Sequence, residues 1–202
     1  MRKSILTLAV LFAALKFSHS ASAALIVNVG STSVGVGHTA TIPITVSNTA
    51  SAASSDIEGM TLTVQIADGT GTTPSIASVD LITGTVWAPA ASPADVYSAA
   101  GAEPQYVSLG ILTDNAGEFI NANGTLATIT INTTGAVGAN YAITLVGTMT
   151  PGDDSVFDNG LGATVPATFN AGQLTVLVPE PTVIGFPILI FAALARRRNH
   201  RE

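Results

Sequence analysis

Apolar and polar residues alternate along most of the middle of this chain. Ala40, Ile42, Ile44 and Val46 are separated by single residues, two of which are threonine. The same period of two recurs in segments 60–66, 105–112, 125–131, 141–145 and 173–176. A period of two places alternate side chains on opposite faces of a strand, so each segment predicts a half-buried β-strand.

The segments between these strands predict turns and surface excursions. We expect one or two strands in 76–87 with a bend at Gly84, and an alanine- and proline-rich surface excursion over 88–104. Pro43 lacks a backbone donor, which predicts an edge strand or a bulge there. No convincing helical period is found. The pattern predicts an all-β domain, a two-sheet β-sandwich of about nine strands.

The first 23 residues have the three parts of a secretory signal peptide. Arg2 and Lys3 precede an apolar run over 5–15, and small residues end the segment. We expect cleavage after Ala21-Ser22-Ala23, so that Ala24 begins the exported protein. The alternative, an amphipathic helix of the domain, is disfavoured because the run has no polar face.

Residues 178–202 predict a second targeting segment. Val178-Pro179-Glu180-Pro181 forms an extended spacer, because the prolines disfavour helix on either side. The apolar segment 182–195 follows, and its strongly apolar side chains favour membrane insertion by roughly 2 to 5 kcal/mol. A helix of this length spans about 21 Å, short of the roughly 30 Å bilayer core, so a buried core helix competes. The cluster Arg196, Arg197 and Arg198 favours a membrane helix, since cationic residues are enriched at the cytoplasmic end of such helices.

This tail resembles the PEP-CTERM sorting signal. The Pro179-Glu180-Pro181 motif, the short transmembrane helix 182–195 and the arginine cluster 196–198 occur in the family's order. Proteins with this signal are processed by membrane proteases called exosortases. The resemblance implies transient anchoring in the inner membrane and cleavage near the motif. The domain would then be released or transferred to the cell surface or extracellular matrix.

Removing both ends leaves one domain, residues 24–177, which has neither lysine, arginine nor cysteine. Its acidic residues are Asp56, Glu58, Asp68, Asp80, Asp95, Glu103, Asp114, Glu118, Asp153, Asp154 and Asp158. Such a surface repels phosphate backbones, so no nucleic-acid partner is expected. Stability must come from packing and hydrogen bonds, because no disulfide can form.

Three segments of this domain resemble cohesin domains. They are Gly37–Ile44, Asp56–Leu62 and Gly124–Ile131, and the similarity covers most of 27–178. Cohesins are nine-stranded jelly-roll modules that bind dockerins in cellulose-degrading assemblies. The resemblance implies the same fold here and a protein partner.

Few residues offer site chemistry. Asp153, Asp154, Asp158 and Asn159 lie in one acidic loop that could form an irregular calcium site, although solvated turn residues explain the loop equally well. No other cofactor is expected.

Catalytic residues are equally scarce in the exported domain. Asp56 and Glu58 could supply a carboxylate pair for glycoside hydrolysis, and His38 is the domain's only histidine. Neither arrangement is specific, so no catalytic residue is predicted. We expect a non-enzymatic surface or matrix protein processed by an exosortase. The alternative is a cohesin-type module that binds a dockerin-like protein, another protein or a polysaccharide.

Overall fold

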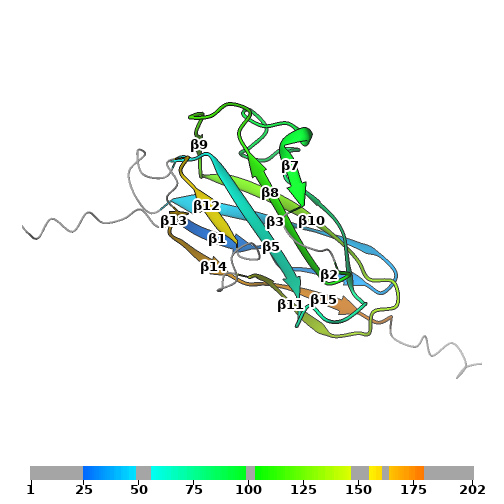
Figure 1. Ribbon diagram of the computed structural model, residues 1–202. Helices are drawn as coiled ribbons and strands as arrows, with labels where there is room; N and C mark the ends of the chain where they lie inside the picture. Colours follow the sequence, from blue (N-terminus) through cyan, green and yellow to red (C-terminus); the bar gives the residue numbers. More distant parts are fainter. Residues whose placement is uncertain (1–24, 49–55, 99–102, 147–154, 161–163, 180–202) are drawn as a thin grey trace, which may run out of the picture.

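The computed structural model describes residues 25–48, 56–98, 103–146, 155–160 and 164–179. These residues form two β-sheets that pack face to face around one core (Figure 1). The expected all-β, two-sheet sandwich is therefore confirmed. The only helical segment described is the 3-10 turn η2 (Pro93–Asp95).

The first sheet has five strands. Its order is β14 (Ala167–Asn170), β1 (Leu25–Val29), β3 (Thr39–Asn48), β10 (Gly124–Asn132) and β6 (Ser75–Asp80). The parallel pair β14 and β1 forms one edge, and every other neighbouring pair is antiparallel.

The second sheet is built on both sides of β5 (Gly59–Ile66). One side carries β8 (Tyr106–Leu112) and then the short edge strand β7 (Val96–Ser98). The other side carries β12 (Val156–Asp158) and β11 (Asn140–Leu145), followed by β13 (Thr164–Val165), β15 (Gly172–Leu177) and β2 (Thr32–Gly35). A separate two-stranded ladder pairs β4 (Asp56–Ile57) with β9 (Ile120–Asn121).

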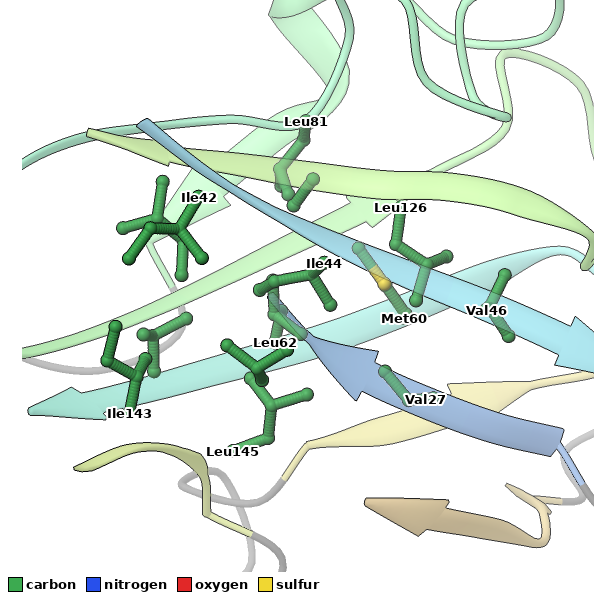
Figure 2. Packing of buried hydrophobic residues seen from close by; sticks show 14 of the residues in the cluster. Val27, Ile42, Ile44, Val46, Met60, Leu62, Leu81, Leu126, Ile143 and Leu145 are labelled. Carbon is green, nitrogen blue, oxygen red and sulfur yellow. The ribbon is translucent and has the colours of Figure 1, made fainter. Parts of the chain in front are cut away.

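The core lies between the two sheets and follows the alternation seen in the sequence. In β3 every second residue is buried, and Ile42 and Ile44 are fully enclosed. Figure 2 shows Ile44 beside Leu62 of β5, and Ile42, Ile143 and Leu145 belong to the same core cluster. Burying these aliphatic side chains is the main favourable term for folding, at roughly 2 kcal/mol for each.

The two terminal segments of the domain pair in parallel and cross together from one sheet to the other. β1 pairs with β14 in the first sheet, and β2 pairs with β15 in the second. Partners are 142 positions apart throughout, including at the hydrogen bonds from Asn170 to Asn28 and from the Gln173 amide to Ser31 Oγ. The crossover therefore keeps one register and closes one side of the sandwich.

A close backbone contact lies at the middle of this crossover. A Cβ atom on Gly172 would lie 2.0 Å from the Gly30 carbonyl oxygen and 2.8 Å from that of Val29. The Gly30 amide in turn donates to the Pro43 carbonyl at 2.8 Å. Glycine is needed at 172 because any side chain would push the two terminal segments apart.

The expectation that Pro43 marks an edge strand or a bulge is wrong. β3 lies between β1 and β10, and the register shift falls in β10 between Thr125 and Ala127. The Pro43 carbonyl faces β1, because it accepts from Gly30, so its missing donor faces β1 as well. β1 ends at Val29. The proline is tolerated inside the sheet because β1 ends beside it, so β1 has no further ladder bond that needs a donor at position 43.

The expected strand in 76–87 and the bend at Gly84 are confirmed by β6 and by the positive φ of Gly84. The alanine- and proline-rich segment that follows differs from expectation: it does not simply cross the surface, because Ala90 and Ala91 are buried beside the enclosed Leu81 and Trp87. The chain then enters β7, a strand that the alanine- and proline-rich composition concealed. Residues 81–95 connect the edge strand of one sheet to that of the other, so these side chains close the second side of the sandwich.

The chain has more strands than the expected nine because the described strands are short pieces. The two terminal segments are each divided where they change sheets, and β11 and β12 occupy different parts of the same edge of β5. The signal peptide 1–23 and the apolar segment 182–195 lie outside the described residues. Within those residues, no helix has the length and hydropathy that a membrane crossing requires.

Replacing Gly172 with alanine should destabilise the domain by about 2 kcal/mol, because the added methyl group meets backbone atoms that cannot rotate away. Urea unfolding followed by circular dichroism measures this change. Ala171→Ser adds one atom at the neighbouring exposed position and should stay within about 0.5 kcal/mol of the native protein. Equal stability of both variants would contradict the close contact.

Candidate functional site

The outer face of the second sheet carries a row of exposed apolar side chains. Tyr97 of β7 lies opposite Gly110 of β8, Gly110 lies opposite Thr61 of β5, and Thr61 lies opposite Val156 of β12. Leu112 is two residues beyond Gly110 on the same face, opposite Gly59. We call Tyr97, Leu112 and Val156 the apolar row.

The two glycines explain how the largest members of the apolar row are held. A Cβ atom on Gly110 would lie within 2.1 Å of the Tyr97 ring, and one on Gly59 would lie 2.3 Å from Leu112 Cδ2. Each side chain therefore packs over a glycine of the neighbouring strand, where no side chain stands in its way. Tyr97 is still 46% exposed and Leu112 49% exposed, so both are fixed in place yet accessible.

Further along β5 and β8, polar contacts replace the apolar row on the same face. Thr63 and Ser108 are fully buried on the same outer face, and their hydroxyl groups lie 2.8 Å apart. Ser155 Oγ accepts from the Thr63 amide at 3.0 Å. These satisfied hydroxyl groups offer no free apolar surface, so the accessible part of the face is the end near the start of β5.

Carboxylates surround that end of the face. Asp95 accepts from the Ser92 amide and hydroxyl and also forms a hydrogen bond with Asp114. The Ser92 hydroxyl, the Ser92 amide and Asp114 lower the pKa of Asp95. The hydrogen bond to Asp95 raises the pKa of Asp114, and burial and the charges of Asp95 and Glu118 add to that effect. Asp114 is therefore the carboxyl of the pair that loses its proton at the higher pH.

Two further carboxylates complete this border. Glu58 Oε1 accepts from the Gly117 amide at 2.7 Å, and Asp158 Oδ1 accepts from the Gly160 amide at 2.8 Å. Asp158 lies opposite Gly59, beside Leu112. With Glu118, whose charge acts on Asp114, these four carboxylates form what we call the acidic end: Glu58, Asp95, Asp114, Glu118 and Asp158. The apolar row thus has a negatively charged rim.

Most of the targeting residues predicted from the sequence lie outside the described part of the chain. This holds for Ala21, Ala23 and Ala24 at the signal cleavage site and for Glu180, Pro181, Arg196, Arg197 and Arg198 of the sorting motif. Val178 and Pro179 are described and exposed just beyond β15. The sorting motif stays a prediction.

The predicted calcium residues are only partly described. Asp153 and Asp154 lie outside the described residues, whereas Asp158 and Asn159 follow one another at the end of β12. The Asp158 carboxylate caps the turn at Gly160. In the described ranges, no three histidine, cysteine, aspartate or glutamate side chains are grouped as metal ligands. Calcium binding stays a prediction.

The candidate catalytic residues have structural roles where they are described. The Glu58 carboxylate holds the loop at Gly117, and its backbone amide donates to the Asp158 carbonyl at 2.9 Å. Asp56 belongs to the β4–β9 ladder. His38 is exposed in the turn before β3, where its amide and carbonyl both bond to Thr133.

Sequence reasoning missed the apolar row. Tyr97 lies in the segment predicted to be an excursion, and the strand pairing that aligns the row joins residues far apart in the chain. One signal was present: Gly59 and Gly110 interrupt two strand patterns, and a glycine inside a strand often marks a close approach by another group.

Comparison with known proteins identifies the fold. No family model and no curated protein sequence matches the chain. Among solved structures, the sixth cohesin of Acetivibrio cellulolyticus scaffoldin B, in complex with a Cel5 dockerin, has 13% identity and a TM-score of 0.57, covering 76% of this chain and 99% of that one. The third ScaC cohesin of the same organism, in complex with the ScaB dockerin, has 21% identity and a TM-score of 0.56 over the same shares.

A cohesin from outside these dockerin complexes is also similar. The non-cellulosomal cohesin of the archaeon Archaeoglobus fulgidus has 15% identity and a TM-score of 0.54, covering 78% of this chain and 94% of that one. Identities this low establish the fold alone. The described sandwich has the cohesin fold, which confirms the fold implied by the three resembling segments.

The Asp95–Asp114 pair predicts a pH-dependent effect of Asp114→Asn. A raised folded-state pKa stabilises the fold only below the group's ordinary pKa of 3.8, and this contribution is lost as pH rises through the folded value. At pH about 7 the two carboxylates repel, and asparagine would remove that repulsion while still donating to Asp95. We therefore expect a higher Tm than native at neutral pH and little difference below pH 3.8.

Asp95→Asn is the matched control. The pKa of Asp95 is lowered, so its charged form stabilises the fold above pH 3.8 and this contribution is lost as pH falls through the lowered value. Its variant should therefore have a lower Tm than native at neutral pH. Thermal unfolding of both variants at the two pH values checks the pair, and Tm changes of one sign for both variants would contradict it.

Proposed function

We propose that the sandwich is a non-enzymatic protein-binding module that docks a partner on the apolar row. The observation that carries this proposal is the exposed alignment of Tyr97, Leu112 and Val156 on one outer sheet face. At this end of the described face, the neighbouring Thr63 and Ser108 are polar and buried, so these side chains form its accessible apolar centre.

The way the apolar row is held supports a binding role. Tyrosine is enriched among the residues that dominate interface energies, because it buries a large area and loses little side-chain entropy. Tyr97 already rests on Gly110, and Leu112 on Gly59, so a partner need not order either side chain. This preorganisation lowers the free-energy cost of binding.

The acidic end indicates the chemistry of the partner. Glu58, Asp95, Asp114, Glu118 and Asp158 border the apolar row, and the domain has no lysine or arginine to balance them. The partner that fits is a protein module with an apolar centre and a basic rim. The similar cohesins from Acetivibrio cellulolyticus were solved in complexes with dockerins, which supports a dockerin-like module as that partner.

The test is capture of secreted proteins from the source organism on immobilised domain, followed by titration of the captured partner. Tyr97→Ala should weaken binding about 30-fold, which corresponds to roughly 2 kcal/mol for an interface anchor. Leu112→Ala should weaken it as well, and added salt should slow association with the basic rim.

The matched control is the pair Thr41→Ala and Thr130→Ala. These two threonines lie opposite each other on the outer face of the first sheet. If binding survives the loss of Tyr97 and Leu112 but is lost with the two threonines, the partner binds the outer face of the first sheet, and the proposal is contradicted. Unchanged Tm values exclude unfolding as the cause.

We further propose that this module is exported and delivered to the cell surface or extracellular matrix by an exosortase. The tail sequence supports this proposal: Pro179-Glu180-Pro181, the apolar segment 182–195 and the arginine cluster 196–198 follow one another directly after the domain. Val178 and Pro179 are exposed at the end of β15, so a protease could reach the adjoining motif. The inner membrane is the transient anchor.

Replacing Pro179, Glu180 and Pro181 with alanine should leave the precursor in the membrane fraction without processing. The physical reason is that the apolar segment is kept while the proposed recognition motif is removed. Intact mass of the protein in each cell fraction measures both processing events at once. In contrast, the control Ile188→Asp with Ile190→Asp should lose membrane retention, because charges oppose insertion. Normal processing of the alanine variant would rule out recognition through the motif.

A further inference from the structure

A second exposed apolar patch lies where the described chain leaves the domain. Val137 is 69% exposed, Leu177 53% and Val178 61%, which are the three highest exposures among the large apolar side chains described. We call these three residues the exit patch. It lies at the tip of β15, and β9 lies at the opposite end of the sandwich (Figure 1).

Ordered contacts hold the exit patch together. The Val178 side chain packs over Gly138, where a Cβ atom would lie 2.5 Å from Val178 Cγ2. The Tyr141 hydroxyl donates to the Val137 carbonyl at 3.1 Å, and the Val36 amide donates to the Leu177 carbonyl at 3.0 Å. The patch is therefore a built surface of three chain segments and does not depend on one protruding residue.

The exit patch and the acidic end lie at opposite ends of the sandwich. Glu58 precedes the start of β5, and Asp114, Glu118 and Asp158 surround the same end. The segments that build the exit patch, residues 32–39, 132–146 and 172–179, contain no acidic residue. Asp68 and Glu103 are the described acids on turns at the patch end. The end nearest the tail is thus the less acidic one.

The length of the spacer keeps the exit patch near the predicted membrane segment. Val178 belongs to the patch, and the apolar segment begins at Thr182. Four residues span at most about 14 Å when extended. A bilayer that holds segment 182–195 therefore lies within reach of Val137, Leu177 and Val178.

We propose that the exit patch docks on the surface of the phospholipid bilayer that anchors the tail, and so orients the domain. This inference rests on the proposed membrane anchoring of segment 182–195. Three aliphatic side chains bind a bilayer weakly by themselves, but the tether supplies a high effective concentration at the surface. The acidic end then points away from the anionic lipid headgroups, which lowers electrostatic repulsion. The apolar row is held toward that outer end while the precursor is anchored.

The absence of cysteine allows a direct test on the full chain in vesicles of phosphatidylcholine and phosphatidylglycerol. A fluorophore is attached to Val137→Cys in the exit patch, to Phe119→Cys at the opposite end, or to Ile190→Cys in the tail, and a lipid-attached quencher is added. Phe119 is the matched control because it is also an exposed apolar residue, at 44%. We expect strong quenching at 190, several-fold weaker but clear quenching at 137, and none at 119.

The outcomes separate this inference from the proposed anchoring. Quenching at 190 with equal signals at 137 and 119 overturns the orientation and leaves the anchoring intact. Lack of quenching at 190 overturns both. A change at 137 that needs no quencher and grows with protein density means that a second copy covers the patch, which also overturns the inference. Leu177→Asp should reduce quenching at 137 and leave quenching at 190 unchanged.

Discussion

The backbone of Gly172 lies against that of Gly30, and the arrangement of the two sheets depends on this contact. The first and last strand segments of the domain pair there in parallel and pass together between the sheets. Because the register does not slip at the crossing, the same two segments form a parallel pair at the edge of each sheet: β1 with β14 in the first and β2 with β15 in the second. Backbone pairing thereby joins the beginning of the domain to its end. No disulfide could do so, because the chain lacks cysteine.

The same topology separates the surfaces of the molecule. The tail leaves from the tip of β15, whereas the loops after β8 and β12 bring the carboxylates together at the other end. The proposed binding face near the acidic end is therefore distant from the proposed point of membrane attachment. A module that serves an external partner gains access from this polarity, because the bilayer and the partner approach different ends.

Much of the sandwich could be predicted from alternation alone. Ile42 and Ile44 are buried because a strand packed on one face needs every second residue to be apolar. The Pro43 prediction failed because it treated the strand by itself: the proline is tolerated where β1 departs, and that departure is set by the crossover at Gly30. Tyr97 was missed because the composition of its segment concealed a short strand whose pairing with β8 is non-local.

The sequence by itself determined the fold class, the confinement of cations to the two terminal segments and the acidic character of the domain. These properties follow from local period and composition, which do not depend on which strands become neighbours. Only the tertiary structure decided that Tyr97, Leu112 and Val156 share a face, that the Asp95 and Asp114 side chains are hydrogen-bonded, and that Val178 packs over Gly138. Each of these associations joins residues from separate segments, and their proximity is fixed by cross-strand register and by loop packing, which no local pattern encodes.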